Sequence, residues 1–242
     1  MFETVLVQPI YNVFVFLIGV MPGGSVGLAI IALTLLIRAL FYPAFTASIR
    51  TQMGMQALQG ELDDINTQYP GKEKAEERAK KTMELYKEHK VHPFAGFLAL
   101  LVQIPVFIAL YFAFFRQGLP HIAERLLYPF VHAPSVVQVD FFGLMNLLSP
   151  HNIMLSVLVV LLQGAVAYLS LGRMSNSGTK TAPEKQAAQR LQQQMMLYFL
   201  PALMGVVSYS LPAAVGLYFA TTNAVSVGQE WLIRRQNNST LK

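Results

Sequence analysis

The sequence has 242 residues, of which 54% are hydrophobic and 13% charged, and its mean hydropathy is +0.43. Because soluble domains carry about 25% charged residues, this composition predicts an integral membrane protein and excludes a large soluble domain within the chain. The sequence contains no cysteine, which excludes disulfides, thiolate metal sites and a cysteine nucleophile. The formal net charge of +5 is explained by basic loops beside a membrane rather than by a nucleic-acid-binding face.

Residues 1–24 contain an apolar stretch that is too short to cross a bilayer. It runs from Val13 to Met21 and ends at Pro22-Gly23-Gly24. No Lys or Arg precedes it, so the basic region that opens a signal peptide is missing. We therefore expect residues 1–24 to form an outer segment that lies in the membrane interface or packs on the helix bundle.

Residues 25–46 form the first predicted transmembrane helix, and it carries Arg38 within its apolar run. A central Arg costs about 2.5–3.5 kcal/mol on insertion scales. One explanation is a wet cavity lined by protein that holds the guanidinium. The alternative is that the Arg38 side chain extends along the helix to the membrane interface. Arg38 is only about 12 Å along the helix from Thr46, where the predicted span ends.

Residues 47–92 are predicted to form a cytoplasmic helical hairpin. Two stripes of apolar side chains repeat at helical spacing on either side of Pro70-Gly71, a pair that breaks helices. Charged residues occupy the other faces, as expected for two amphipathic arms in water. The stripes are Leu58, Leu62, Ile65 and Tyr69 in the first arm, and Ala75, Ala79, Met83 and Tyr86 in the second.

Four further apolar segments bring the predicted number of transmembrane helices to five. The last apolar stretch is twice the length of one span, and Ser210-Leu211-Pro212 near its middle predicts a turn between two helices. The predicted spans are 93–115, 151–172, 195–210 and 212–233, joined by an outer loop 116–150 and a cytoplasmic loop 173–194, with a cytoplasmic tail 234–242.

The positions of the Lys and Arg residues predict the orientation of the chain. Fifteen lie in 47–92, 173–194 and 234–242, whereas two lie in 116–150. Cytoplasmic loops carry the excess of Lys and Arg in membrane proteins. We therefore expect the N-terminus outside and the C-terminus in the cytoplasm.

Polar residues repeat within the predicted spans and suggest a hydrophilic groove that opens to the cytoplasm. Thr34 and Arg38 share one helix face, and Asn223 and Ser226 share another. Single polar side chains also serve as hydrogen bonds between helices, but several stripes together with a charge favour a groove. The candidate groove residues are Arg38, Thr34, Gln163, Asn223, Ser226 and Gln103.

No catalytic or metal-binding motif appears in the sequence. All five histidines lie in loops or at the ends of spans, and the zincin, P-loop and G-x-S-x-G patterns are missing. We therefore expect a protein that is not an enzyme and that needs no cofactor or metal. A small-solute transporter or channel is one function open to a groove of this kind.

Four stretches resemble YidC-type membrane protein insertases, in the short form without the large outer domain. These are Gly27 to Arg38 followed by Pro43, Leu85 to Pro93, Leu101 to Tyr111, and Leu211 to Tyr218 with Asn223. Three positions depart from the usual pattern of the family: Phe219 replaces a Trp, His92 an Asn and Ala214 a Gly.

The resemblance implies an all-α integral membrane protein of the bacterial plasma membrane, with five transmembrane helices around the groove and the cytoplasmic hairpin. It implies an ATP-independent insertase and chaperone that helps small membrane proteins insert and fold. Arg38 matches the groove arginine of the family, and Gln163 matches a groove glutamine. The implied partners are nascent membrane proteins with acidic outer tails, the lipid bilayer, the Sec translocon and the ribosome.

Overall fold

The computed structural model describes residues 3–92, 95–112, 119–171, 191 and 193–240, and these residues are mostly helical. The main helices are α1 (Gln8–Val20), α2 (Val26–Leu40), α3 (Tyr42–Ala57), α4 (Gln59–Gln68), α5 (Ala75–Glu88), α6 (Ala95–Tyr111), α7 (Ile153–Leu171), α9 (Leu200–Ser210) and α10 (Ala213–Thr240). The shorter elements are η1 (Glu3–Val7), η2 (Pro22–Gly24), η4 (Glu124–Leu126) and η6 (Met195–Phe199), with the antiparallel strands β1 (Asp140–Phe141) and β2 (Met145–Asn146).

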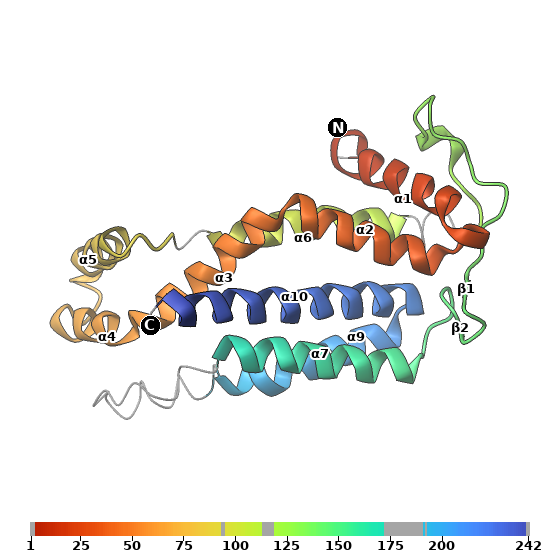
Figure 1. Cartoon of the computed structure of the whole chain (residues 1–242). Coiled ribbons are helices and arrows are strands. Elements are labelled where there is room, and N and C mark those ends of the chain that lie inside the picture. The colour runs from red at the N-terminus through yellow and green to blue at the C-terminus, as the bar shows by residue number, and fades with distance from the viewer. Residues whose placement is uncertain (1–2, 93–94, 113–118, 172–190, 192, 241–242) are drawn as a thin grey trace.

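Helix α10 lies at the centre of an elongated bundle (Figure 1). It packs against α7 and α9 on one side and against α2 and α3 on the other, while α6 packs against α3. Helices α4 and α5 extend beyond the bundle at the end where α10 finishes, and β1 and β2 lie at the opposite end (Figure 1). The predicted loop 173–194 lies almost entirely outside the described residues.

Helix α1 packs on the bundle, which was one of the two arrangements expected for residues 1–24. Its face carrying Tyr11, Phe14 and Ile18 is buried against α2 and α6. Asn12 fastens the helix to the following outer segment, because its Nδ2 donates to the Leu126 carbonyl (2.8 Å) and its Oδ1 accepts from the Tyr128 amide (2.6 Å). The uncharged helix is therefore tied to the bundle by both apolar and polar contacts.

The continuous helix expected over 25–46 is divided in the structure. Helix α2 ends at Leu40, and α3 continues from Tyr42 after a bend of 70°. Pro43 explains the break, because it has no N–H to donate to the carbonyl of Ala39 and its ring disfavours a straight helix. The bend redirects α3, which extends to Ala57 and therefore well into the range predicted for the hairpin.

The structure has two helices in the range 47–92 beyond α3, namely α4 and α5, and they are in contact with each other. The two helices are joined through Pro70 and Gly71, whose positive φ of 79° suits glycine. A small apolar cluster of Leu58, Leu85 and Tyr86 holds them together, with Leu62 and Ile65 packed against it. The second predicted stripe is partly wrong, since Met83 is 49% exposed and Leu85 is buried instead.

The apolar stretch near the end of the chain is divided at the expected place. Helix α9 ends at Ser210, Leu211 is extended, and α10 begins at Ala213. Helix α10 then runs to Thr240, so it includes most of the segment 234–242 that was expected to be a tail.

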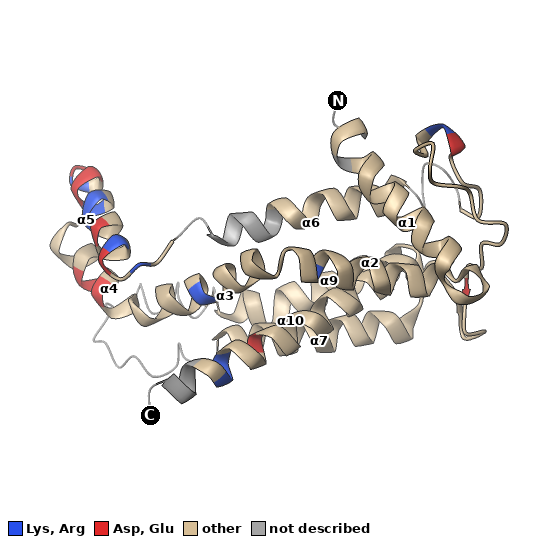
Figure 2. Cartoon of the chain, turned by 45° about the horizontal axis from the view of Figure 1, so that its top comes forward, with Lys and Arg blue, Asp and Glu red and all other residues tan. Residues whose placement is uncertain are grey.

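One described helix, Ile153–Leu171, is long and apolar enough to cross a membrane by itself, and the bent pair α2–α3 passes the same test if it counts as one span. The apolar helices Gln8–Val20, Leu101–Tyr111 and Met195–Ser210 are shorter. Figure 2 shows charged residues gathered mainly on α4 and α5, whereas the bundle is nearly free of them. This distribution is typical of a protein whose bundle is surrounded by lipid.

Candidate functional site

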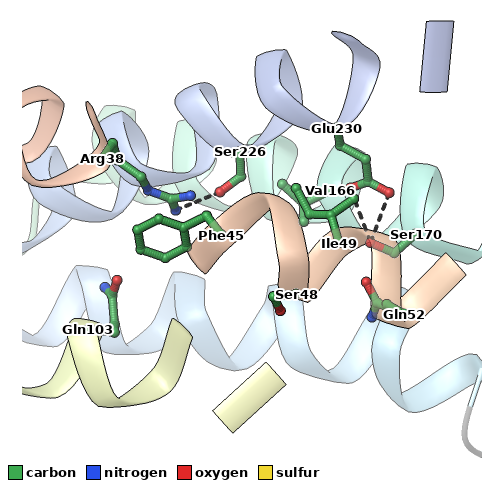
Figure 3. Close-up of a pocket in the computed structure, with 10 residues that line it drawn as sticks. All are labelled: Arg38, Phe45, Ser48, Ile49, Gln52, Gln103, Val166, Ser170, Ser226 and Glu230. Atoms are coloured by element: carbon green, nitrogen blue, oxygen red, sulfur yellow. Dashed lines mark hydrogen bonds between the residues drawn. The ribbon is translucent and has the colours of Figure 1, made fainter. Parts of the chain in front are cut away.

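A cavity of about 360 Å³ lies where α2, α3, α6, α7 and α10 come together. Each of the five helices contributes at least one polar side chain to the lining, and a few apolar side chains complete it (Figure 3). The lining residues are Arg38, Phe45, Ser48, Ile49, Gln52, Gln103, Val166, Ser170, Ser226 and Glu230.

Arg38 points from α2 toward α10 at one end of the cavity (Figure 3). Its guanidinium donates from Nη2 to Ser226 Oγ (2.7 Å) and to the Thr222 carbonyl (3.2 Å), and from Nη1 to Gln229 Oε1 (3.0 Å). The guanidinium carbon also lies 4.2 Å from the centre of the Phe45 ring, a favourable cation–π distance. With 9% of its surface exposed, Arg38 is held inside the bundle rather than extended along the outside.

Neutral groups satisfy the buried charge of Arg38. Among the described residues, no carboxylate lies within ion-pair distance of its guanidinium. The guanidinium has five N–H donors, and three of them make the hydrogen bonds given above. The other two N–H groups make no hydrogen bond to the residues that the structure describes, and they can donate to water or to a ligand anion in the cavity.

Glu230 supplies a negative charge at the other end of the same cavity (Figure 3). It is 3% exposed, and its Oε1 accepts from Arg234 Nη2 at 2.7 Å. Ser170 Oγ lies 3.2 Å from Glu230 Oε2 and joins the end of α7 to α10. The cavity therefore has the unpaired cation Arg38 at one end and the Glu230–Arg234 ion pair at the other.

The structure brings together three of the six predicted groove residues. Arg38, Gln103 and Ser226 line the cavity, and Gln103 donates to the Tyr218 hydroxyl at 2.5 Å. Thr34 is buried outside the lining, and its hydroxyl donates to the Ile30 carbonyl of its own helix (2.7 Å).

Gln163 and Asn223 also lie outside the cavity lining. Gln163 is half-buried on α7, one turn before the lining residue Val166. Asn223 is buried, and its Nδ2 has no hydrogen-bond partner within the described part of the chain.

Sequence reasoning missed the cavity residues that come from α3. Ser48, Ile49 and Gln52 line the cavity because α3 continues along the bundle after the bend. The signal was their spacing of three, four and seven residues after Phe45, which places all four on one helix face. Gln229, one residue before Glu230, was also missed and holds Arg38.

No cluster of potential metal ligands exists among the residues that the structure describes. Arg38 and Glu230 are the charged residues of the cavity lining. The arrangement can bind and orient polar or charged groups of another molecule, and the carboxylate can interact with a cation as the guanidinium can with an anion.

Comparison with known proteins identifies the family. The 60Kd inner membrane protein family matches residues 17–240. The chain is 32% identical over 235 residues to a protein of Oceanobacillus iheyensis named membrane protein insertase YidC, covering 96% of this chain and 83% of that protein. It is 31% identical over 219 residues to the protein of the same name from Francisella tularensis subsp. novicida, covering 90% of this chain.

The two relatives differ in length. The chain spans about a third of the Francisella protein, at 34%, but most of the Oceanobacillus protein. The family match covers nearly the whole chain, including every helix that lines the cavity. The chain therefore belongs to the 60Kd inner membrane protein family, which includes the YidC proteins.

Proposed function

We propose that the chain is a membrane protein insertase that helps small membrane proteins insert and fold without hydrolysing ATP. The names of the relatives support this function. The observation that carries it is Arg38, a buried cation at the end of a cavity that several polar side chains line. Neutral groups hold its guanidinium, and two of its N–H donors make no hydrogen bond within the described part of the chain. Such a site can hold an acidic segment for a short time without covalent chemistry.

In the proposed mechanism, the cavity is a hydrated groove that opens toward the cytoplasm. A short acidic tail of the substrate enters the groove, and one of its carboxylates interacts with the guanidinium. At about 4 Å and an effective dielectric near 20, one such pair contributes roughly 4 kcal/mol before desolvation is subtracted. The tail then moves outward, driven by the membrane potential and by burial of the substrate's apolar helix in lipid.

The proposed topology has five transmembrane helices, with the N-terminus outside and the C-terminus in the cytoplasm. The excess of Lys and Arg in 47–92 supports this orientation. The pair α4–α5 then projects into the cytoplasm, where it makes the first contact with an arriving chain. The Sec translocon and the ribosome are the proposed partners that deliver such chains.

The test is insertion of a single-span substrate with an acidic outer tail into proteoliposomes by the wild type, Arg38→Lys and Arg38→Ala. We expect Arg38→Lys to retain most of the activity and Arg38→Ala to lose at least tenfold, because the positive charge is the active feature. Arg235→Ala is the matched control, since Arg235 is exposed and lies outside the cavity lining.

A second substrate with a neutral tail separates the electrostatic role from folding. If Arg38→Ala abolishes insertion of both substrates, the helix bundle is damaged. The role of the charge is then tested by whether Arg38→Lys still inserts the substrate with the acidic tail. Equal dependence of acidic and neutral tails on Arg38, with the bundle folded, would contradict the proposed mechanism. Passage of small solutes through the same liposomes would favour a transporter or channel instead.

A further inference from the structure

A second and larger cavity lies outside the groove, between α3 and the connector that follows α5. Its volume is about 540 Å³. We call it the connector pocket and define it by its lining residues, which are Tyr42, Pro43, Thr46, Ala47, Arg50, Thr51, Gly54, His89, Lys90, Val91 and His92. None of these residues lines the groove.

The charged side chains of the connector pocket are basic. Arg50 comes from α3 and Lys90 from the connector, and two histidines stand on either side of Lys90 and Val91. Residues 47–92 contain eight Asp and Glu residues, and none of them lines the pocket. Figure 2 shows the acidic residues of this region on α4 and α5. The nearest carboxylate pairing is Glu61 Oε1 to His89 Nε2, at 3.9 Å.

Lys90 occupies a backbone position that favours glycine. Its φ is 53°, in the left-handed region. The amide of Lys90 donates to the Lys87 carbonyl (3.2 Å) and that of Val91 to the Tyr86 carbonyl (2.8 Å), a pattern that ends many helices with a glycine at this position. A lysine held in such a conformation beside a pocket indicates a use for its charge.

Val91 fixes the connector against α3. Its side chain packs with Leu85 and Tyr86 and lies directly beside Gly54, where an added Cβ would come within 2.7 Å of Val91 Cγ2. The glycine therefore permits the close approach of the two segments. Because α3 and the connector are held together at this point, Arg50 from one segment and Lys90 from the other line the same pocket.

The connector pocket lies where two segments pass from polar to apolar sequence. The apolar helix α2 ends just before Tyr42, and the apolar helix α6 begins at Ala95, shortly after His92. Tyrosines are common at the level of lipid headgroups. Thr46 also lines the pocket, and within the described part of the chain its buried hydroxyl has no hydrogen-bond partner.

We propose that the connector pocket binds a phosphate-bearing anion, of the chemistry shared by the headgroup of an anionic phospholipid and free phosphate. Arg50 donates to the phosphate oxygens from one wall and Lys90 from the other. Basic pockets at the cytoplasmic side of helix bundles are suited to such headgroups. The proposal does not depend on the groove, and its test does not use insertion activity, so the two can fail separately.

The experiment measures equilibrium binding to the full chain in detergent micelles. The probes are dihexanoyl phosphatidylglycerol, dihexanoyl phosphatidylcholine as the lipid without net charge, and inorganic phosphate. The pocket variants are Lys90→Gly and Arg50→Gln/Lys90→Gly. The control variant Lys72→Gln/Lys80→Gln removes two positive charges that lie on exposed parts of the hairpin outside the pocket.

We expect the wild type to bind phosphatidylglycerol in preference to phosphatidylcholine. The double pocket variant should bind phosphatidylglycerol roughly 30-fold more weakly, and the control variant within about twofold of the wild type. Lys90→Gly should unfold at the same or a higher temperature than the wild type, since glycine suits the positive φ. This variant therefore separates loss of binding from loss of folding.

The inorganic phosphate arm identifies the source of the anion. Binding of phosphate that is lost in the same pocket variants would support a site for free phosphate, and its absence beside phosphatidylglycerol binding would support a lipid site. Equal weakening in the pocket and control variants would overturn the proposal, because net charge alone would then explain the attraction. The same conclusion follows if the wild type binds neither of the two anionic probes in preference to phosphatidylcholine.

Discussion

Arg38 and Glu230 lie in one cavity but bind different partners. Arg38 is held by the Thr222 carbonyl, Ser226 and Gln229, whereas Glu230 is held by residues Ser170 and Arg234. A direct pair between the two would neutralise both charges and leave little attraction for a ligand. Glu230 is already paired with Arg234, whereas Arg38 has no carboxylate partner among the described residues, so the positive charge of Arg38 is the one in this cavity that no ion pair neutralises.

Glu230→Gln should make the cavity more favourable for acidic tails. The substitution removes about 1 kcal/mol of repulsion between Glu230 and a carboxylate in the cavity, so insertion of a substrate with an acidic tail should rise about fivefold. A tail that carries Lys in place of one acid should gain less. The measurement is insertion into proteoliposomes with the two substrates compared side by side.

The control for Glu230→Gln is Glu84→Gln, which removes the same charge from an exposed position on α5. Glu230→Gln should also lower the free energy of unfolding by about 1–3 kcal/mol, because Arg234 loses its partner. The loss stays moderate since the Arg234 side chain is 20% exposed and can turn to water. An identical effect of both variants on tail preference would exclude a role for Glu230 in the cavity.

At the scale of the helices, the contact between α7 and α9 depends on a glycine. Gly205 is buried where a Cβ would overlap the side chain of Val160. Small residues at such crossings let the backbones of membrane helices approach closely. The α7–α9 contact matters for the cavity because α7 supplies Val166 and Ser170 to its lining.

Gly205→Ala should destabilise the bundle by about 1–3 kcal/mol through overpacking. Val160→Ala in the same chain should restore most of this loss, since it removes the methyl groups that the new Cβ would meet. Unfolding in mixed micelles, followed by circular dichroism, gives the free energies for the double-mutant cycle. If the two substitutions destabilise additively, the close approach at Gly205 does not limit the packing.

Some helix boundaries could be predicted from the sequence and others could not. The break before α10 was predictable because Leu211-Pro212 interrupts a stretch twice the length of a span. The bend at Phe41 was missed, although Pro43 was visible, because the apolar run continues through it and suggests one straight helix. The buried face of α5 was partly missed since Met83 and Leu85 are both apolar, and periodicity alone does not choose between them.

The cavity was predictable only in part for a related reason. Helical spacing places Arg38 and Thr34 on one face of α2. It does not predict which part of that face is covered by α10 and which part is open to the cavity. Thr34 therefore bonds to its own helix, while Ser226 reaches the guanidinium. Gln52 could not be found without the direction of α3, which the bend sets.

At the scale of the whole molecule, the distribution of charge predicts which end faces the cytoplasm. Residues 47–92, which contain α4 and α5, hold eight of the 18 Lys and Arg residues. Helices α4 and α5 lie at one end of the bundle, and β1 and β2 lie at the other (Figure 1). Basic segments are retained on the cytoplasmic side of membranes. The orientation can therefore be tested with one label at each end.

Single-cysteine variants give this test directly, because the sequence has no cysteine that must first be removed. A membrane-impermeant maleimide should label Val136→Cys in intact cells, since Val136 is 57% exposed beside the outer strands. Lys72→Cys, in the turn between α4 and α5, should be labelled only after permeabilisation. The reverse pattern would contradict the proposed orientation.

The way in which Arg38 is fixed also determines where electrical work is done. A charge that crosses the full membrane potential exchanges about 2.3 kcal/mol for each 100 mV, but a charge that does not move exchanges none. Three hydrogen bonds and the Phe45 ring hold the guanidinium in place. In the proposed mechanism, the membrane potential therefore does work on the charges of the substrate chain and not on the guanidinium of Arg38.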